Sequence, residues 1–237
     1  MRLRVALLLC SVMIFDLSAV AEEFAAPEGM TLIYQHDFQD GQAERYQPTD
    51  VSAWKLQAEG DNQFLALTKK HSNFSPPFRS PLNRTLIRDL EVSSFVMDIR
   101  FQSTIADYPH RSLCLFFGYQ DDAHLYYVHF GKRTDDHANQ VFIVNGAPRV
   151  KISTKTTAGT PWTDEWHRAR IVRDVGSGEI TVYFDDLKTP IMTAVDRTFV
   201  KGRLGFGSFD DIGNFDDVKI YVPEQDGGGR AGGNGSR

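Results

Sequence analysis

Every second residue of the stretch FVMDIRF, positions 95–101, has a large apolar side chain. One side of an extended chain would carry Phe95, Met97, Ile99 and Phe101, and the other side Val96, Asp98 and Arg100. Successive side chains of a β-strand point to opposite faces of the sheet, whereas a helix repeats its apolar positions every three to four residues. The stretch therefore predicts a strand that packs one face on a core.

Similar short runs recur on both sides of this stretch, separated by the turn-forming residues Gly, Pro, Asn and Asp. No run sustains helical periodicity over three turns, so there is no room for crossover helices between strands. An all-β fold of antiparallel sheets packed face to face is the architecture that suits such a series of strands. Besides residues 95–101, the predicted strands are 31–38, 54–56, 64–68, 113–119, 125–130, 141–144, 167–172, 179–184, 203–209 and 215–222.

The first 21 residues are predicted to be a signal peptide rather than part of the fold. Residues 5–15 form an apolar run, and Ala19-Val20-Ala21 matches the small-x-small cleavage rule. A membrane span needs roughly 20 apolar residues, and Asp16 interrupts this run too early. We therefore predict a secreted or periplasmic protein with no transmembrane span after signal cleavage; an uncleaved anchor is the alternative.

The remainder is predicted to form one β-sandwich domain over residues 22–222, followed by a disordered Gly-rich tail over 223–237. The net charge is −5 and the basic residues are scattered, which argues against a nucleic-acid partner. Signal cleavage would leave Cys114 as the one cysteine, so no internal disulfide is expected. Its apolar surroundings predict a buried small side chain rather than a nucleophile.

Five blocks of the sequence stand out together: HDFQDG (36–41), WHRARIVR (166–173), GEITVYFDD (178–186), GRLGFGSF (202–209) and FDDVKI (215–220). The closing blocks follow the order typical of the concanavalin A-like lectin/glucanase superfamily, including laminin-G-like domains, and the opening block resembles the first strand of such domains in secreted bacterial proteins. This resemblance implies a jelly-roll β-sandwich. Because the superfamily includes lectins, carbohydrate-binding modules, glycosidases and domains of the 3-keto-disaccharide hydrolase type, it leaves the function open.

Signals for catalysis are weak. Glucanases resembling this chain carry Glu-x-Asp-x-x-Glu on one strand, and that motif is absent here. Asp98 shares a strand face with Arg100, and we expect this pair to lower the pKa of Asp98, the wrong direction for a general acid. The sequence contains no Gly-x-Ser-x-Gly motif, so nothing in it predicts a Ser-His-Asp triad. If the chain is a hydrolase of a glycoside or a 3-keto-sugar, His129 or Asp136 would be its general base.

The resemblance also implies a structural Ca²⁺ that ties the first strand to the last. Carboxylates and backbone carbonyls are the oxygen ligands that Ca²⁺ takes. The alternative is a set of solvated aspartates at strand ends. The implied ligands are Asp37, Asp40, Gly41, Asp216 and Asp217.

The predicted functional site is a carbohydrate site. Alternation along residues 125–130 places Tyr127 and His129 on the face opposite to Tyr126, Val128 and Phe130. A sugar site combines an apolar or aromatic surface with a few convergent hydrogen-bonding groups. We predict that Tyr127 and His129 form its floor; the alternatives are that both are ordinary half-buried sheet residues and that the domain is a laminin-G-type protein-interaction module. The predicted rim residues are His110, Arg111, Lys132, Asp136 and Asn139.

Overall fold

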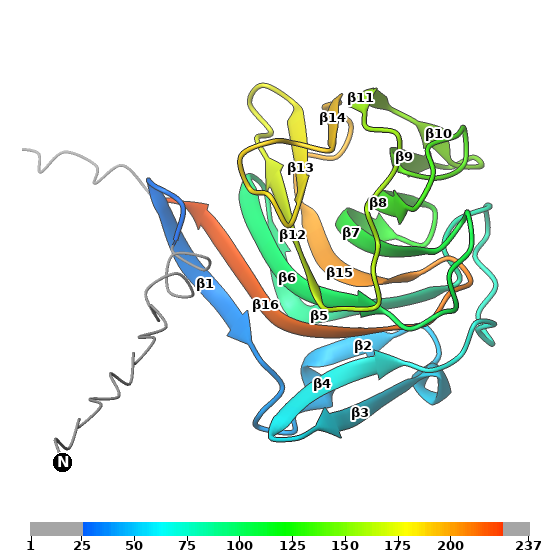
Figure 1. The fold of residues 1–237 in the computed structure, drawn as a ribbon. Coiled ribbons are helices and arrows are strands. Elements are labelled where there is room, and N and C mark those ends of the chain that lie inside the picture. The colour runs from blue at the N-terminus through cyan, green and yellow to red at the C-terminus, as the bar shows by residue number, and fades with distance from the viewer. Residues whose placement is uncertain (1–25, 225–237) are drawn as a thin grey trace, which may run out of the picture.

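The computed structural model describes residues 26–224, which form two antiparallel sheets packed face to face (Figure 1). The predicted all-β sandwich is therefore confirmed. The predicted signal peptide lies outside the described residues, and so does the predicted tail beyond Glu224. No helix of the described residues is long and apolar enough to cross a membrane.

The larger sheet has nine strands in the order β11-β14-β13-β12-β6-β16-β4-β3, and β1 pairs with β16. The long β16 pairs with β4 near its start and with β1 over its second half, so the first and last strands lie side by side (Figure 1). The strands are β1 (Met30–His36), β3 (Trp54–Glu59), β4 (Asn62–Leu67), β6 (Phe95–Ser103), β11 (Ser153–Thr156), β12 (His167–Arg173), β13 (Glu179–Phe184), β14 (Met192–Val195) and β16 (Gly213–Pro223).

The smaller sheet has seven strands in the order β10-β9-β8-β7-β15-β5-β2. Two single-turn 3-10 helices, η3 (Ala43–Arg45) and η4 (Val51–Ala53), flank β2. The chain passes from the larger to the smaller sheet through the loop of residues 68–82, between β4 and β5. The strands are β2 (Tyr46–Pro48), β5 (Asn83–Val92), β7 (Ser112–Asp121), β8 (His124–Gly131), β9 (Gln140–Asn145), β10 (Val150–Lys151) and β15 (Gly202–Ser208).

The core lies between the sheets, and the alternation of β6 is confirmed. Phe95, Met97, Ile99 and Phe101 are all buried in the main apolar cluster. Burial of apolar surface contributes roughly 25 cal/mol per Å², so four such side chains on one strand fix which face of β6 points inward. A one-residue slip in register would place all four on the outer face.

The predicted pairing of Asp98 with Arg100 is wrong. The register of β6 and β12 places Arg170 directly opposite Asp98, and Arg170 binds this carboxylate through Nε at 2.6 Å and Nη2 at 2.7 Å. Arg168 adds a third contact at 3.0 Å. Arg100 instead donates to Asp217, at 3.2 Å. Cross-strand neighbours lie closer than same-face neighbours along one strand, which are about 6.5 Å apart.

A second apolar cluster covers the outer face of the smaller sheet. Its members include Cys114, so the predicted burial of this cysteine is confirmed, and burial raises the pKa of its thiol. Phe78, from the 68–82 loop, packs against the cluster. Under the same loop, the buried Arg84 pairs with Asp122 and lies 5.5 Å from the ring centroid of Phe74. The outer face is therefore covered by a loop. The buried members of the cluster are Leu86, Cys114, Phe116, Leu125, Tyr127, Phe142 and Val144.

Candidate functional site

Tyr127 and His129 lie on the predicted face but are not open to solvent. Tyr127 is 0% exposed and His129 is 6% exposed. The Tyr127 ring stacks on Phe142 with centroids 5.0 Å apart, and its hydroxyl accepts a hydrogen bond from Arg149 Nη1 at 2.8 Å. The ring of Phe209 lies 6.2 Å from that of His129. The expectation of an exposed floor is corrected, because loops cover this part of the sheet.

Both ring nitrogens of His129 are engaged. Nδ1 lies 2.8 Å from the carbonyl oxygen of His137, which can only accept, so Nδ1 carries the proton. Nε2 then accepts a hydrogen bond from Ser112 Oγ at 2.9 Å. Burial lowers the pKa of His129 to about 4, so the ring is neutral at pH 7. No nitrogen is left over to act as a general base on a bound ligand.

Ser112 connects His129 to a buried carboxylate. The backbone N–H of Ser112 donates to Asp211 Oδ2 at 2.8 Å, and its Oγ lies 3.3 Å from the same oxygen. Tyr108 donates its hydroxyl proton to Asp211 Oδ1 at 2.7 Å. Ser112, His129 and Asp211 do not form a catalytic triad, because the carboxylate contacts the serine rather than the histidine and Ser112 is buried. The contacts instead form a polar chain from His129 to Tyr108.

The far end of this chain opens into a pocket of about 440 Å³, which we call the rim pocket. Ligand pockets span roughly 300–1,000 Å³, so its size suits a small ligand. Three loops build it: the 68–82 loop, the β6–β7 loop and the β15–β16 loop. The half-buried Tyr108 and the exposed Asp210 lie in its lining, while burial holds the pKa of Asp211 above its usual range. The lining residues are Lys70, His71, Ile105, Ala106, Asp107, Tyr108, Asp210 and Asp211.

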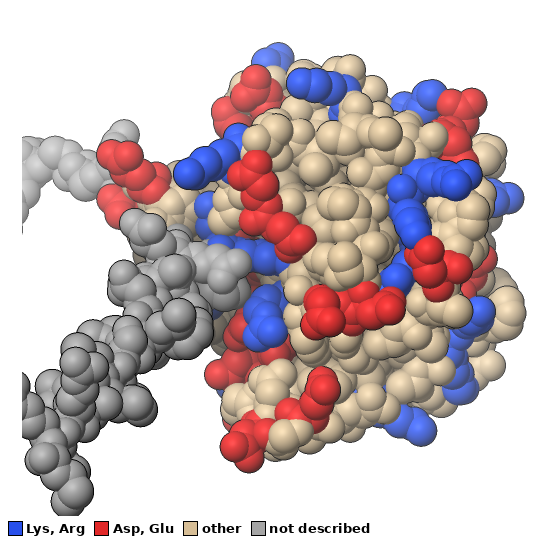
Figure 2. Space-filling model, in the orientation of Figure 1, with Lys and Arg blue, Asp and Glu red and all other residues tan. Residues whose placement is uncertain are grey.

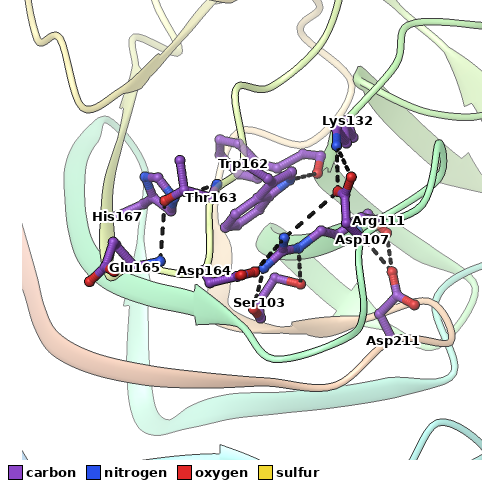
Figure 3. Close-up of polar contacts among 12 residues, drawn as sticks. Ser103, Asp107, Arg111, Lys132, Trp162, Thr163, Asp164, Glu165, His167 and Asp211 are labelled. Atoms are coloured by element: carbon purple, nitrogen blue, oxygen red, sulfur yellow. Dashed lines mark hydrogen bonds and ion pairs between the residues drawn. The ribbon is translucent and has the colours of Figure 1, made fainter.

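Two predicted rim residues meet at the edge of this pocket (Figure 3). Lys132 forms an ion pair with Asp107, and its hydrogen bond holds the pKa of Asp107 below the usual range. Arg111 Nη1 lies 3.8 Å from Asp107 and 2.9 Å from Asp164. Arg111 also donates to the hydroxyl and carbonyl oxygens of Ser103, and it is buried. Arg111 therefore anchors the loops, whereas Lys132 stays partly accessible.

The other predicted rim residues do not converge on one point. His110 is exposed, with Nδ1 3.8 Å from Asp135. Asp136 is exposed and pairs with Lys151, 2.5 Å away. Asn139 is fully buried and has a positive φ of 53°. Its side-chain amide donates a hydrogen bond to Thr134 and accepts one from Thr160. Asn139 thus shapes the β8–β9 loop from inside, and none of the three lines the rim pocket.

The predicted Ca²⁺ ligands already have partners within the protein. Asp40 accepts from His36 and from Arg45, at 2.9 and 3.0 Å. Among residues 26–224, no three His, Cys, Asp or Glu side chains form a group that could hold a metal ion. As they stand, the residues do not fit a Ca²⁺ site, and Ca²⁺ stays a prediction that needs a direct test.

The partners of the remaining predicted ligands show the same pattern. Asp37 accepts from the backbone N–H of Gln39 at 3.2 Å. The buried Asp216 accepts from Asn62 at 3.0 Å and from the backbone N–H of Asp217 at 2.8 Å. Each of these carboxylates therefore already accepts at least one hydrogen bond within the protein.

Comparisons with known proteins define the fold. No protein-family model matches the sequence, and no curated protein matches it. The carbohydrate-binding module CBM66 from Bacillus subtilis is 13% identical, with 75% of this chain and 96% of that chain covered and a TM-score of 0.54. Domain 4 of AbnA, a GH43 extracellular arabinanase from Geobacillus stearothermophilus solved with arabinotriose, is 10% identical, with 83% and 94% covered and a TM-score of 0.52.

A third structure, a Bacillus subtilis protein of unknown function with a galectin-like fold, is 11% identical, with 81% of this chain and 96% of that chain covered and a TM-score of 0.53. These matches confirm the predicted concanavalin A-like lectin/glucanase fold. At such low identities they define the fold alone, and they leave the binding residues to be argued from the site.

Proposed function

We propose that this chain is a secreted or periplasmic carbohydrate-binding protein and that the rim pocket holds the sugar. The main support for this proposal is the arrangement of Tyr108 and Asp211, which are joined by a 2.7 Å hydrogen bond at the pocket wall. Beside them, Asp210 is exposed, and its carboxylate can accept hydrogen bonds from sugar hydroxyls. The tyrosine ring adds apolar surface. The similarity of this fold to carbohydrate-binding module CBM66 and to domain 4 of AbnA also supports the proposal.

Binding is favoured over hydrolysis by the state of the acid and base candidates. A general acid needs a raised pKa and access to the substrate. Asp107 has its pKa lowered by Lys132. Asp211 has a raised pKa, but donors engage both of its oxygens and it is 1% exposed. His129 is buried and neutral. Asp107 lacks the raised pKa, Asp211 lacks the access, and His129 does not line the rim pocket.

Calorimetric titration with a panel of neutral and acidic oligosaccharides tests the proposal. We expect binding by the wild-type protein and at least a ten-fold loss in Tyr108→Ala and Asp210→Asn. A tenfold loss is about 1.4 kcal/mol, the scale of one charge-assisted hydrogen bond. Asp61→Asn is the matched control, because Asp61 is exposed in the turn between β3 and β4, at the opposite end of β4 from Lys70.

Three outcomes decide the proposal. Loss of affinity in the pocket variants but not in Asp61→Asn, with an unchanged melting temperature, supports it. Wild-type affinity in Tyr108→Ala, or no binding to any sugar, contradicts it. Turnover of a bound oligosaccharide would show an enzyme and replace the binding function.

A further inference from the structure

Two arginines share one aromatic ring on the outer face of the smaller sheet. The Cζ atoms of Arg79 and Arg149 lie 5.6 and 4.6 Å from the ring centroid of Phe209. Arg149 also lies 4.6 Å from the ring centroid of Phe142. The backbone N–H of Arg149 donates to the carbonyl oxygen of Arg79 at 3.4 Å, which joins the 68–82 loop to the segment before β10. The two cations are thus held as neighbours.

These two guanidinium groups lack carboxylate partners. Within the described part of the chain, no Asp or Glu oxygen lies within the 4.0 Å ion-pair limit of either one. Arg79 is exposed and Arg149 is partly exposed. The Tyr127 hydroxyl takes one of the five N–H donors of Arg149. Six other arginines do have a carboxylate within that limit: Arg45, Arg84, Arg100, Arg111, Arg168 and Arg170.

An arginine held over an aromatic ring keeps its in-plane donors available. The ring attracts the cation and restricts its rotamers, so less side-chain entropy is lost when the donors bind a ligand. The planar fork of a guanidinium matches two oxygens of a carboxylate or a sulfate group. Two adjacent guanidinium groups without carboxylate partners therefore form a preorganised site for an oxyanion.

We infer that Arg79 and Arg149 bind a carboxylate or sulfate group of an acidic glycan. This inference rests on the proposed carbohydrate function, because Phe209 directly precedes Asp210 and Asp211 of the rim pocket. Phe209 therefore links the ring that the two arginines share to the two carboxylates of the pocket lining.

An acidic glycan fits better than a nucleic acid. A polyphosphate chain needs many clustered cations, and Figure 2 shows acidic and basic side chains interspersed on the face in view. The net charge of −5 also repels polyanions at long range. Two specific guanidinium groups suit a ligand with isolated anionic groups better than a densely charged one.

Titration with three probes tests the inference. The probes are a xylo-oligosaccharide with a single sulfate group, one with a single glucuronic acid substituent and an unsubstituted xylo-oligosaccharide, so the first two distinguish sulfate from carboxylate. We expect one acidic probe to bind, to bind less tightly as salt increases, and to bind at least ten-fold more weakly to Arg79→Ala. Arg79 makes no side-chain hydrogen bond in the described structure, so this variant should fold normally.

Two further variants complete the design. Arg149→Lys keeps the charge but loses the planar fork, and we expect a loss of several-fold. Lys188→Ala has the same charge change as Arg79→Ala, in an exposed turn between β13 and β14 of the larger sheet. Its affinity for the acidic probe should equal that of the wild type.

The outcomes separate this inference from the proposed function. Selective weakening by Arg79→Ala supports it. Equal weakening by Lys188→Ala means general charge attraction and overturns it. Binding of neutral sugars alone also overturns it but leaves the rim pocket proposal intact, whereas no binding by any sugar ends both.

Discussion

The two ends of one polar chain differ in their access to solvent. His129 lies at one end, 6% exposed beneath the loops that cover the smaller sheet. Tyr108 lies at the other end, where its ring lines the rim pocket. Both belong to the region of the sequence that is richest in histidine and tyrosine. The difference teaches that a residue's face on a sheet and its access to a ligand are separate questions.

The buried end shows how polar side chains are tolerated beneath a loop. Burying a polar group is costly unless it finds a hydrogen-bond partner. Tyr127 meets Arg149, and His129 meets Ser112 and His137. Pairing of this kind turns candidate ligand-binding groups into parts of a second core, whereas Asp210 at the open end stays exposed.

The largest expected effect comes from Tyr127→Ala. Removing a fully buried ring that stacks on Phe142 should lower the free energy of unfolding by about 3–5 kcal/mol. Tyr127→Phe keeps the ring and should cost about 1–2 kcal/mol, because a donor of Arg149 loses its acceptor. Denaturant unfolding measures both. A small loss of stability in Tyr127→Ala, together with a lost sugar affinity, would restore Tyr127 as the floor of an accessible site.

The next effect concerns pH and the same buried end. His129 has its pKa lowered to about 4 by burial, against roughly 6.5 when unfolded. The unfolded chain therefore binds a proton that the native protein excludes, so stability is lost as pH falls from about 6.5 towards 4. This shift corresponds to on the order of 3 kcal/mol. Unfolding titrations across this range should show a flatter pH profile for His129→Gln, and identical profiles would contradict the assignment.

Sequence patterns predicted the inward faces well and the covered outer face poorly. The alternation in β6 identified its core side chains because apolar residues occupy every second position. The ten-residue β5 went unrecognised, since Arg84, Arg88 and Asp89 give it the composition of a solvated segment. Arg84 is nevertheless 1% exposed beneath the 68–82 loop. Whether a loop lies over an outward face depends on long-range packing, which local periodicity does not encode.

The candidate site shows the same limit. The predicted rim residues contact the rim pocket at Asp107, which forms an ion pair with Lys132. The pocket itself needs His71, Tyr108 and Asp210, which belong to three loops far apart in the chain. The adjacent pair Asp210-Asp211 was visible as a turn between two strands, but nothing local indicates that Asp211 is buried against Tyr108 and Asp210 is not. Convergence of loops is a property of the sheet order.

The smallest expected effect is the response of the melting temperature to a Ca²⁺ chelator, which tests the predicted Ca²⁺ site. Arg100 lies 3.2 Å from Asp217 and 3.9 Å from the buried Asp216, so a cation already faces these carboxylates. We expect chelation to shift the melting temperature by less than about 1 °C, a few tenths of a kcal/mol for a domain of this size. A larger drop that Asp216→Asn abolishes would establish the Ca²⁺ site.

Arg100→Gln sharpens that test, because it removes the cation while leaving the carboxylates in place. Asp216 has its pKa raised mainly by burial, and the neighbouring charge of Asp217 raises it further. Without Arg100, added Ca²⁺ should relieve this repulsion and raise the melting temperature by a few degrees. If the variant and the wild type respond equally to Ca²⁺, Arg100 does not take the place of a metal ion between the first and last strands.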